Sequence, residues 1–278
     1  MQVVKRIFHF YLNSSVHVAF AASAMAWVTL VELNLAYDKY LLSFIFFATI
    51  TGYNFVKYFG LAKFHHRRLA GWLKVIQVFS FIAFLSMCYF AIYLEINTLT
   101  LIGILGLVTF FYAIPVMIPK HYMFDSHKNL RQIGGLKVYV IALVWTFSTV
   151  FLPVVNNAIS IDTDIVIIGI QRFCFVLVIM LPFEIRDLNY DSLKLATIPQ
   201  KIGIEKTKIF GVLLLTVVIM LEYATEELSV NNKVSTLIIG LVTLLFLLFS
   251  NKNQSQYYSA FWVESLPIIW LGILLIIS

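Results

Sequence analysis

The chain has 278 residues, of which 61% are hydrophobic and only 12% are charged, and its mean hydropathy is +0.90. So few polar side chains cannot cover a soluble globule of this size, and the composition therefore predicts an integral membrane protein. A formal net charge of +6 fits a basic membrane face that attracts anionic headgroups or phosphorylated substrates, so we expect no nucleic-acid partner.

Nine apolar runs follow one another along the chain, each near the ~20 residues that a spanning helix needs. The seventh is the weakest because Glu222 shortens its uncharged core, so eight spans is the main alternative. We predict a single all-α transmembrane domain over residues 1–278, with about nine transmembrane helices around a central cavity. The runs cover residues 16–36, 41–58, 72–94, 99–118, 138–155, 165–183, 209–225, 234–250 and 257–277.

Basic residues fall mainly on one side of these runs. The amino terminus and the connections after runs two, four, six and eight carry most of them, whereas acidic residues predominate in the other connections. Because basic loops remain in the cytoplasm, the amino terminus is predicted to be cytoplasmic and the carboxyl terminus external. We expect a multi-pass protein of the bacterial inner membrane, with the cavity opening toward the long polar connections on the cytoplasmic side.

Three ionisable residues, Glu32, Arg172 and Glu264, lie inside the runs. Charge within a bilayer is costly and calls for a partner. We predict that Arg172 pairs with Glu264 or Glu32. Since Arg172 lies about three helical turns from the end of the sixth run, we expect a structural ion pair there and no direct part in chemistry.

Three carboxylates, Glu184, Asp187 and Asp191, close the sixth run. Offsets of three and four place them on one face of a helix, where like charges repel unless a cation lies between them. Oxygen ligands at a membrane surface favour Mg²⁺ holding a phosphate. The alternative is a solvated helix end, with Arg186 and Lys194 as neighbours of the carboxylates.

The sequence from Arg186 to Asp191, followed by Thr197-Ile-Pro199 and later by Gly203, resembles the second aspartate-rich motif of UbiA-type intramembrane prenyltransferases. In that family a pair of aspartates leads into Thr-Leu-Pro and then a glycine, and Ile198 replaces the leucine here. A second similarity is the stretch Tyr112–Lys120, which resembles the family's Tyr, Pro and basic segment after span four. The resemblance covers most of the chain.

The family's first aspartate-rich motif is degenerate in this chain. Asn54 remains after the second run, but the carboxylates that should follow it are absent, and a cationic stretch over residues 63–68 comes next. This stretch either supplies cations to the site or only marks the cytoplasmic side. The site would therefore keep one metal-binding half and gain a half built from side-chain cations.

The resemblance implies Mg²⁺-dependent transfer of a polyprenyl group from a prenyl diphosphate to a lipophilic acceptor. Cations would neutralise the charge that develops on the departing diphosphate. Asp187 and Asp191 would be the catalytic residues. The metal ligands would be Glu184, Asp187, Asp191 and Asn54. The diphosphate contacts would come from Tyr112, Lys57, Lys63, Arg68, Lys120 and Arg131.

Two other functions remain open from the sequence. The loss of the first motif could leave a catalytically weakened protein that binds prenyl or lipid phosphates as a non-enzymatic membrane partner. A transporter is supported only by the number of spans and the buried charges.

Overall fold

The computed structural model describes residues 2–64, 71–113, 135–189, 196–225 and 228–277, with side chains left undescribed at 59–64 and 72. Every regular element in these ranges is helical, which confirms the predicted all-α class. The elements are α1 (Gln2–Asn13), α2 (Val16–Glu32), α3 (Lys39–Phe64), α4 (Gly71–Ala91), α5 (Ile96–Ala113), α6 (Leu136–Thr146), η2 (Phe147–Phe151), α7 (Leu152–Asn156), α8 (Thr163–Asp187), α9 (Ile198–Ile202), α10 (Ile204–Ala224), α11 (Val230–Phe249), η4 (Tyr258–Val263) and α12 (Leu266–Ile277).

Helical segments overlie all nine predicted apolar runs, the fifth as α6, η2 and α7 in succession and the ninth as η4 and α12. By length and composition, six of the described helices could cross a membrane. The number rises to seven if α1 and α2, which meet at a bend of 53°, form one span. The chain is thus a multi-pass membrane protein, and nine crossings stay a prediction.

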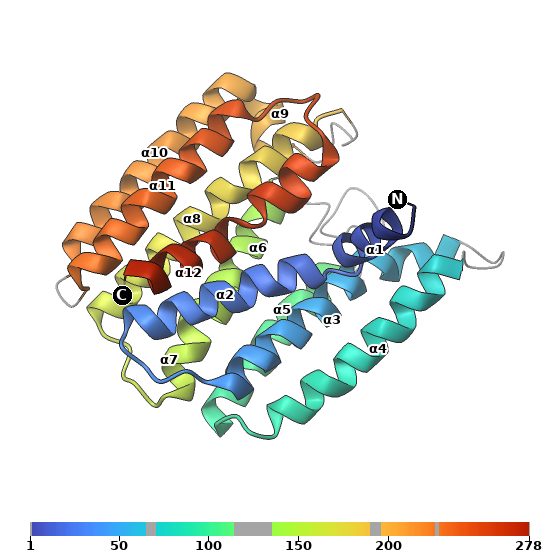
Figure 1. The fold of residues 1–278 in the computed structure, drawn as a ribbon, viewed down its shortest axis with the longest axis horizontal. Coiled ribbons are helices and arrows are strands. Elements are labelled where there is room, and N and C mark those ends of the chain that lie inside the picture. The colour runs from blue at the N-terminus through green and yellow to red at the C-terminus, as the bar shows by residue number, and fades with distance from the viewer. Residues whose placement is uncertain (1, 65–70, 114–134, 190–195, 226–227, 278) are drawn as a thin grey trace, which may run out of the picture.

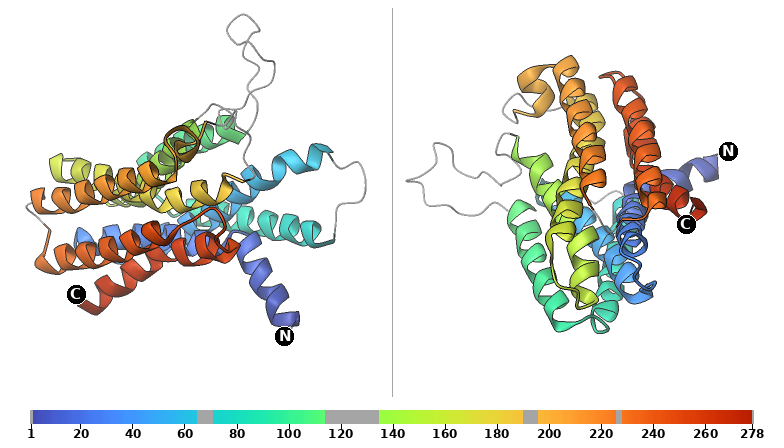
Figure 2. Two further views of the ribbon diagram at one scale, coloured as in Figure 1. Left: turned by 90° about the horizontal axis from the view of Figure 1, so that it is seen from above. Right: turned by 90° about the vertical axis from the view of Figure 1, so that its left-hand side faces the viewer.

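The helices pack in a closed circuit. From α2 the circuit passes through α12, α11, α10, α8 and α6, and it returns through α7, α5 and α3 to α2. Helix α4 packs against α3 at the margin of the bundle (Figure 1). The two termini lie toward opposite ends of the long axis of the bundle in Figure 1 and in the left-hand view of Figure 2.

Burial differs greatly between helices. Most of α8 is buried, whereas α4 and α5 expose most of their apolar side chains, as lipid-facing helices do. Helix α2 carries a run of alanines over residues 19–26 that are almost all buried. Small side chains let neighbouring backbones approach closely, which is how helices associate where lipid removes the hydrophobic driving force. The sequence of α2 therefore suits a position in the interior.

Gly211 lies where α10 packs tightly against α8 and α11. A Cβ atom at this position would overlap the methyl groups of Leu181 on α8 and Leu247 on α11, and both leucines are fully buried. We expect Gly211→Val to lower the free energy of unfolding in detergent by about 1–3 kcal/mol through overpacking. Gly272→Val is the matched control, because the space around Gly272 is open and the change in helix propensity is the same. Equal losses in the two variants would contradict this packing.

Candidate functional site

The carboxylates at the end of α8 face different partners. Glu184 is only 2% exposed, and its Oε1 lies 3.3 Å from Nζ of Lys137 on α6. Asp187 is 23% exposed, and its Oδ1 accepts a 2.8 Å hydrogen bond from Nε of Arg186 and lies 2.8 Å from Nη2 of the same guanidinium. Among the described residues, no three acidic, histidine or cysteine side chains come together closely enough to hold a metal ion. The first two carboxylates of the predicted cluster are therefore each neutralised by a protein cation.

The Thr-Ile-Pro-Gln sequence after these carboxylates builds the corner between α8 and α10. Thr197 is the N-cap of α9, and its backbone N–H donates to Oε1 of Gln200 at 3.0 Å. Pro199 lies in the first turn, where its missing N–H costs nothing. Gly203 has a φ of 80°, a value that favours glycine, and it joins α9 to α10. These motif residues thus shape the backbone beside the site.

The side chain of Asn54 connects three helices by hydrogen bonds. It is 3% exposed, and its Oδ1 accepts a 2.8 Å bond from the Ser15 hydroxyl. Its Nδ2 donates to the carbonyl of Ser14 at 3.0 Å and to Oγ of Ser80 at 2.8 Å. The side chain therefore ties the bend between α1 and α2 to α3 and α4, and these bonds already engage both ends of the amide. The proposed role of Asn54 as a metal ligand stays a prediction.

Lys57 lies one turn beyond Asn54, on the same helix. Its ammonium donates to Oγ of Ser15 at 2.9 Å and lies 6.0 Å from the centre of the Tyr53 ring. Protein atoms surround Lys57 on most sides, yet its side chain keeps a large accessible surface. This cation is therefore fixed in direction and accessible, as a contact to phosphate oxygens requires.

Aromatic side chains accompany Lys57 in the interior. Nε1 of Trp145 on α6 donates to the hydroxyl of Tyr53 at 2.8 Å. Tyr112 on α5 is buried, and its phenol interacts electrostatically with that of Tyr53. Three helices thus bring two phenols and an indole to the neighbourhood of the lysine. The predicted site residues Lys57 and Tyr112 lie close to one shared neighbour, Tyr53.

Sequence reasoning missed Glu264 as a member of this group, because it considered Glu264 only as a partner of Arg172. The carboxylate of Glu264 interacts electrostatically with Lys57 and Arg186, and also with Tyr53. Glu264 lies seven residues into the ninth run, whereas Lys57 lies one residue before the end of the second. Their positions in the sequence therefore gave no signal that linked them.

Five of the predicted site residues have no described side chain. Asp191, Lys120, Arg131 and Arg68 lie outside the described residues, as does the side chain of Lys63.

Arg172 pairs with Glu32, which confirms one of its two predicted partners. The distance from the guanidinium to Oε2 of Glu32 is 3.0 Å, and both side chains are buried. Arg172 also donates to the carbonyl of Met25 at 2.7 Å and stacks 4.7 Å from the ring centre of Trp270. The pair lies away from the carboxylates that end α8, so its role is structural.

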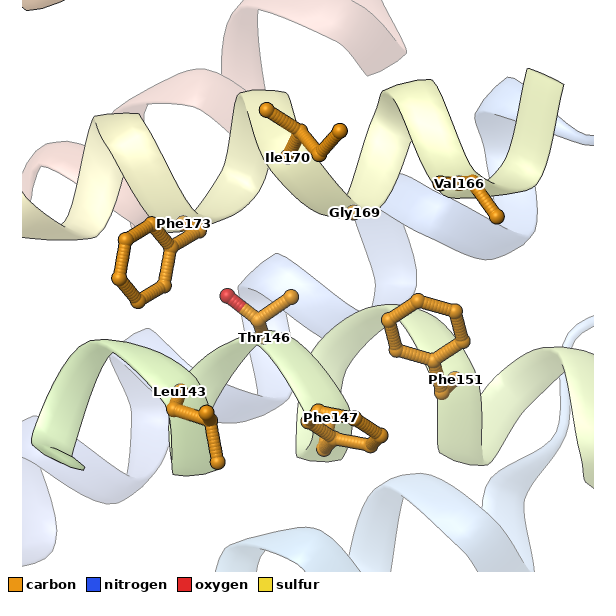
Figure 3. A pocket seen from close by; sticks show the side chains of 8 residues that line it. All are labelled: Leu143, Thr146, Phe147, Phe151, Val166, Gly169, Ile170 and Phe173. Atoms are coloured by element: carbon orange, nitrogen blue, oxygen red, sulfur yellow. The ribbon is translucent and has the colours of Figure 1, made fainter. Parts of the chain in front are cut away.

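A separate hollow of about 240 Å³ lies between α8 and the α6–η2 segment. Figure 3 shows its side chains, which are apolar apart from Thr146. Phe151 from η2 reaches across to Gly169 on α8. None of the polar residues described above lines this hollow, which therefore suits hydrocarbon and not a phosphate. Its lining residues are Leu143, Thr146, Phe147, Phe151, Val166, Gly169, Ile170 and Phe173.

A circuit of helices with charged and aromatic side chains gathered near the ends of α3 and α8 defines a polytopic membrane protein with a polar interior site. No protein-family model and no curated protein sequence matches the chain. Solved structures do match it. A UbiA homolog from Aeropyrum pernix K1 superimposes with a TM-score of 0.65 at 14% identity, over 94% of this chain and 97% of that one.

Two further structures agree with this comparison. A digeranylgeranylglyceryl phosphate synthase matches with a TM-score of 0.58 and 16% identity, over 98% of this chain and 97% of that one. A UbiA homolog from Archaeoglobus fulgidus matches with a TM-score of 0.52 and 10% identity, over 96% of this chain and 95% of that one. The chain therefore has a UbiA-type fold, as the motif resemblance predicted.

Proposed function

We propose that the protein is a Mg²⁺-dependent prenyltransferase that moves a polyprenyl group from its diphosphate to a lipophilic acceptor. One observation carries the proposal: within a UbiA-type fold, the accessible Lys57 and the Arg186–Asp187 pair belong to one electrostatic group, which Glu264 links. Such a group can hold an anionic headgroup while the apolar helices accommodate the chain. We place this end of the bundle at the cytoplasmic face of the membrane, with the cavity opening there.

The donor set at the end of α8 suits Mg²⁺. This ion prefers oxygen ligands and keeps several waters, so one or two carboxylates together with substrate phosphates suffice to bind it. Asp187 and Asp191 would hold the ion, and Mg²⁺ would supply neutralisation of the charge on the departing diphosphate. Because Glu184 is paired with Lys137 and Asn54 with three neighbours, we assign these two residues a supporting part.

The chain's own residues have separable tasks in this proposal. Lys57 would bind phosphate oxygens from the α3 side, oriented by its bond to Ser15. Lys137 and Glu184 would fix α6 against α8. Tyr53 and Trp145, joined by their hydrogen bond, present aromatic surface beside Lys57, where ring faces can stabilise a passing carbocation. The bilayer and the surrounding helices would keep water away from that cation.

Calorimetric binding to the detergent-purified protein tests the proposal. We expect farnesyl or geranylgeranyl diphosphate to bind with Mg²⁺ and to bind at least ~10-fold more weakly after the metal is removed with EDTA, a difference of about 1.4 kcal/mol. The corresponding prenyl alcohols, which lack the diphosphate, are the control ligands and should show no dependence on the metal. No binding under any metal condition would reject the prenyltransferase proposal.

A further inference from the structure

Glu264 is held by an unusual backbone feature. The segment η4, over Tyr258–Val263, is a π-helix that ends immediately before it, and the backbone N–H of Glu264 donates to the carbonyl of Ser259, five residues earlier, at 3.1 Å. Single π-turns inside helices occur often at functional sites, because they rotate the residues that follow. Here the π-turn sets the direction of Glu264, which lies in the turn between η4 and α12.

The π-turn is itself anchored to α8. Nε2 of Gln254 donates both to Oγ of Ser259, at 2.6 Å, and to the carbonyl of Pro182, at 2.7 Å. Pro182 lies only two residues before Glu184, so the anchor connects the start of the ninth apolar run to the end of α8 that carries the carboxylates. The position of Glu264 is thereby coupled to that of the proposed diphosphate site.

The carboxylate of Glu264 is available to a ligand. Within the described part of the chain it makes no side-chain hydrogen bond and no ion pair within 4.0 Å. Protein atoms surround Glu264 on most sides, yet its side chain keeps accessible surface. This differs from Glu32 and Glu222, which are at most 2% exposed and bonded to Arg172 and Gln171. A carboxylate that is interior, accessible and unpaired is placed to accept a proton or a hydrogen bond from a bound molecule.

The charges around Glu264 restrict what that molecule can be. Lys57 and Arg186 are its electrostatic neighbours, and both are cations. Asp187 already neutralises Arg186, so Lys57 is left to balance Glu264, and a neutral hydroxyl can donate a hydrogen bond to this carboxylate without adding a further charge. The phenols of Tyr53 and Tyr11 also interact electrostatically with it, so the surroundings suit an amphipathic alcohol or phenol.

We infer that Glu264 is the general base for the acceptor, and that the acceptor attacks through a hydroxyl oxygen; this inference rests on the prenyltransferase function proposed above. As the bond between C1 of the prenyl chain and the diphosphate oxygen breaks, the hydroxyl oxygen forms a bond to C1. The hydroxyl proton passes to the carboxylate of Glu264. Diphosphate leaves with the electron pair, and the product is a prenyl ether. Lys57 and Arg186 would contact the oxygens of the departing diphosphate.

Chemical labelling tests the accessibility of Glu264 without any substrate. Dicyclohexylcarbodiimide is apolar and reacts with carboxyl groups that lie in accessible apolar sites. We expect it to modify Glu264 at least tenfold faster than Glu32 or Glu222 in peptides analysed by mass spectrometry, and we expect farnesyl diphosphate with Mg²⁺ to slow that labelling. If Glu264 reacts no faster than the two buried glutamates, the inference is overturned, whatever the protein binds.

Hydrolysis of the prenyl diphosphate, in which water takes the place of the acceptor, tests whether Glu264 acts as the base. We expect Glu264→Gln to reduce diphosphate release from geranylgeranyl diphosphate by about 100-fold or more, with less than a twofold change in the affinity for that substrate. The wild-type rate should fall at acid pH as the carboxylate is protonated, and the Gln variant should lack this acid limb. Glu205→Gln, on the exposed first turn of α10, is the control.

The two proposals fail in different ways. If the wild-type protein binds no prenyl diphosphate, the prenyltransferase function is rejected. The labelling result would still decide whether Glu264 faces a ligand cavity. Two results would overturn the role of Glu264 as the base without affecting the diphosphate site. One is a wild-type protein that binds the prenyl diphosphate but releases no diphosphate from it. The other is a Glu264→Gln variant that retains both the rate and its fall at acid pH.

Discussion

Replacing Asp187 with Asn is expected to abolish the Mg²⁺-dependent part of prenyl diphosphate binding. Removing one partner of a desolvated charge interaction costs about 2–5 kcal/mol, which corresponds to a loss of roughly 30-fold or more in affinity. The Asn side chain has nearly the same volume, so the fold should survive. Arg186, released from its bonds to the Asp187 carboxylate, remains able to contact phosphate. Binding measured without metal should therefore change little.

Two comparisons make the Asp187→Asn result specific. Asp191→Asn should produce the same loss, because both carboxylates are assigned to the ion, whereas Glu205→Gln removes a carboxylate from exposed helix surface and should leave binding unchanged. Calorimetric titrations at matched ionic strength, with Mg²⁺ and with EDTA, provide the measurement. If Asp187→Asn and Asp191→Asn both keep the full dependence on Mg²⁺, the metal assignment at the end of α8 is wrong.

The second large effect is expected from Arg172→Met. Breaking a buried ion pair by removing one partner costs about 3–5 kcal/mol, since the other charge stays buried without compensation. Here the Glu32 carboxyl, which is 2% exposed, would lose its ion-pair partner, and the stacking on Trp270 would also be lost. We expect a corresponding fall in the free energy of unfolding in mixed detergent, with little direct effect on the diphosphate site.

A double variant separates two contributions to the loss of stability: the buried carboxyl left without its partner, and the loss of packing. Adding Glu32→Gln to Arg172→Met removes the uncompensated carboxylate, so the double variant should be more stable than Arg172→Met alone. Lys206→Met, at an exposed position of α10, controls for the change of Lys or Arg into an apolar residue. If the single and double variants unfold at the same denaturant concentration, the ion pair does not explain the stability.

Much of the fold follows from local sequence. Runs of about 20 apolar residues specify helices wherever lipid removes the alternative of bonding to water, and helical segments overlie all nine predicted runs. The buried pairing of Arg172 was also predictable, because a charge inside a run requires a partner at its own depth. The corner after α8 is local too, since Thr197, Pro199 and Gly203 each favour the backbone conformation that they adopt.

The partners of the candidate site residues, in contrast, depend on the tertiary structure. Sequence spacing places Glu184 and Asp187 on one helix face, but only the neighbouring helix α6 brings Lys137 to the first of them. Likewise, Asn54 satisfies the motif register, yet packing of α2 and α4 provides the serines that engage it. Sequence gives the depth of a residue along its own helix. It does not give the rotation of that helix or the identity of its neighbours.

Glu264 is the clearest example of a side chain whose direction could not be predicted from the sequence. Its position along the ninth run could be predicted, and a charge there called for an explanation. The direction of its side chain could not, because a π-turn over Tyr258–Val263 changes the helical register just before it. That turn is held by Gln254 against Pro182, a contact between segments 72 residues apart. The sequence by itself therefore determined the class of protein and the position of its helices, whereas long-range packing decided which interior carboxylate has no hydrogen-bond or ion-pair partner among the described residues.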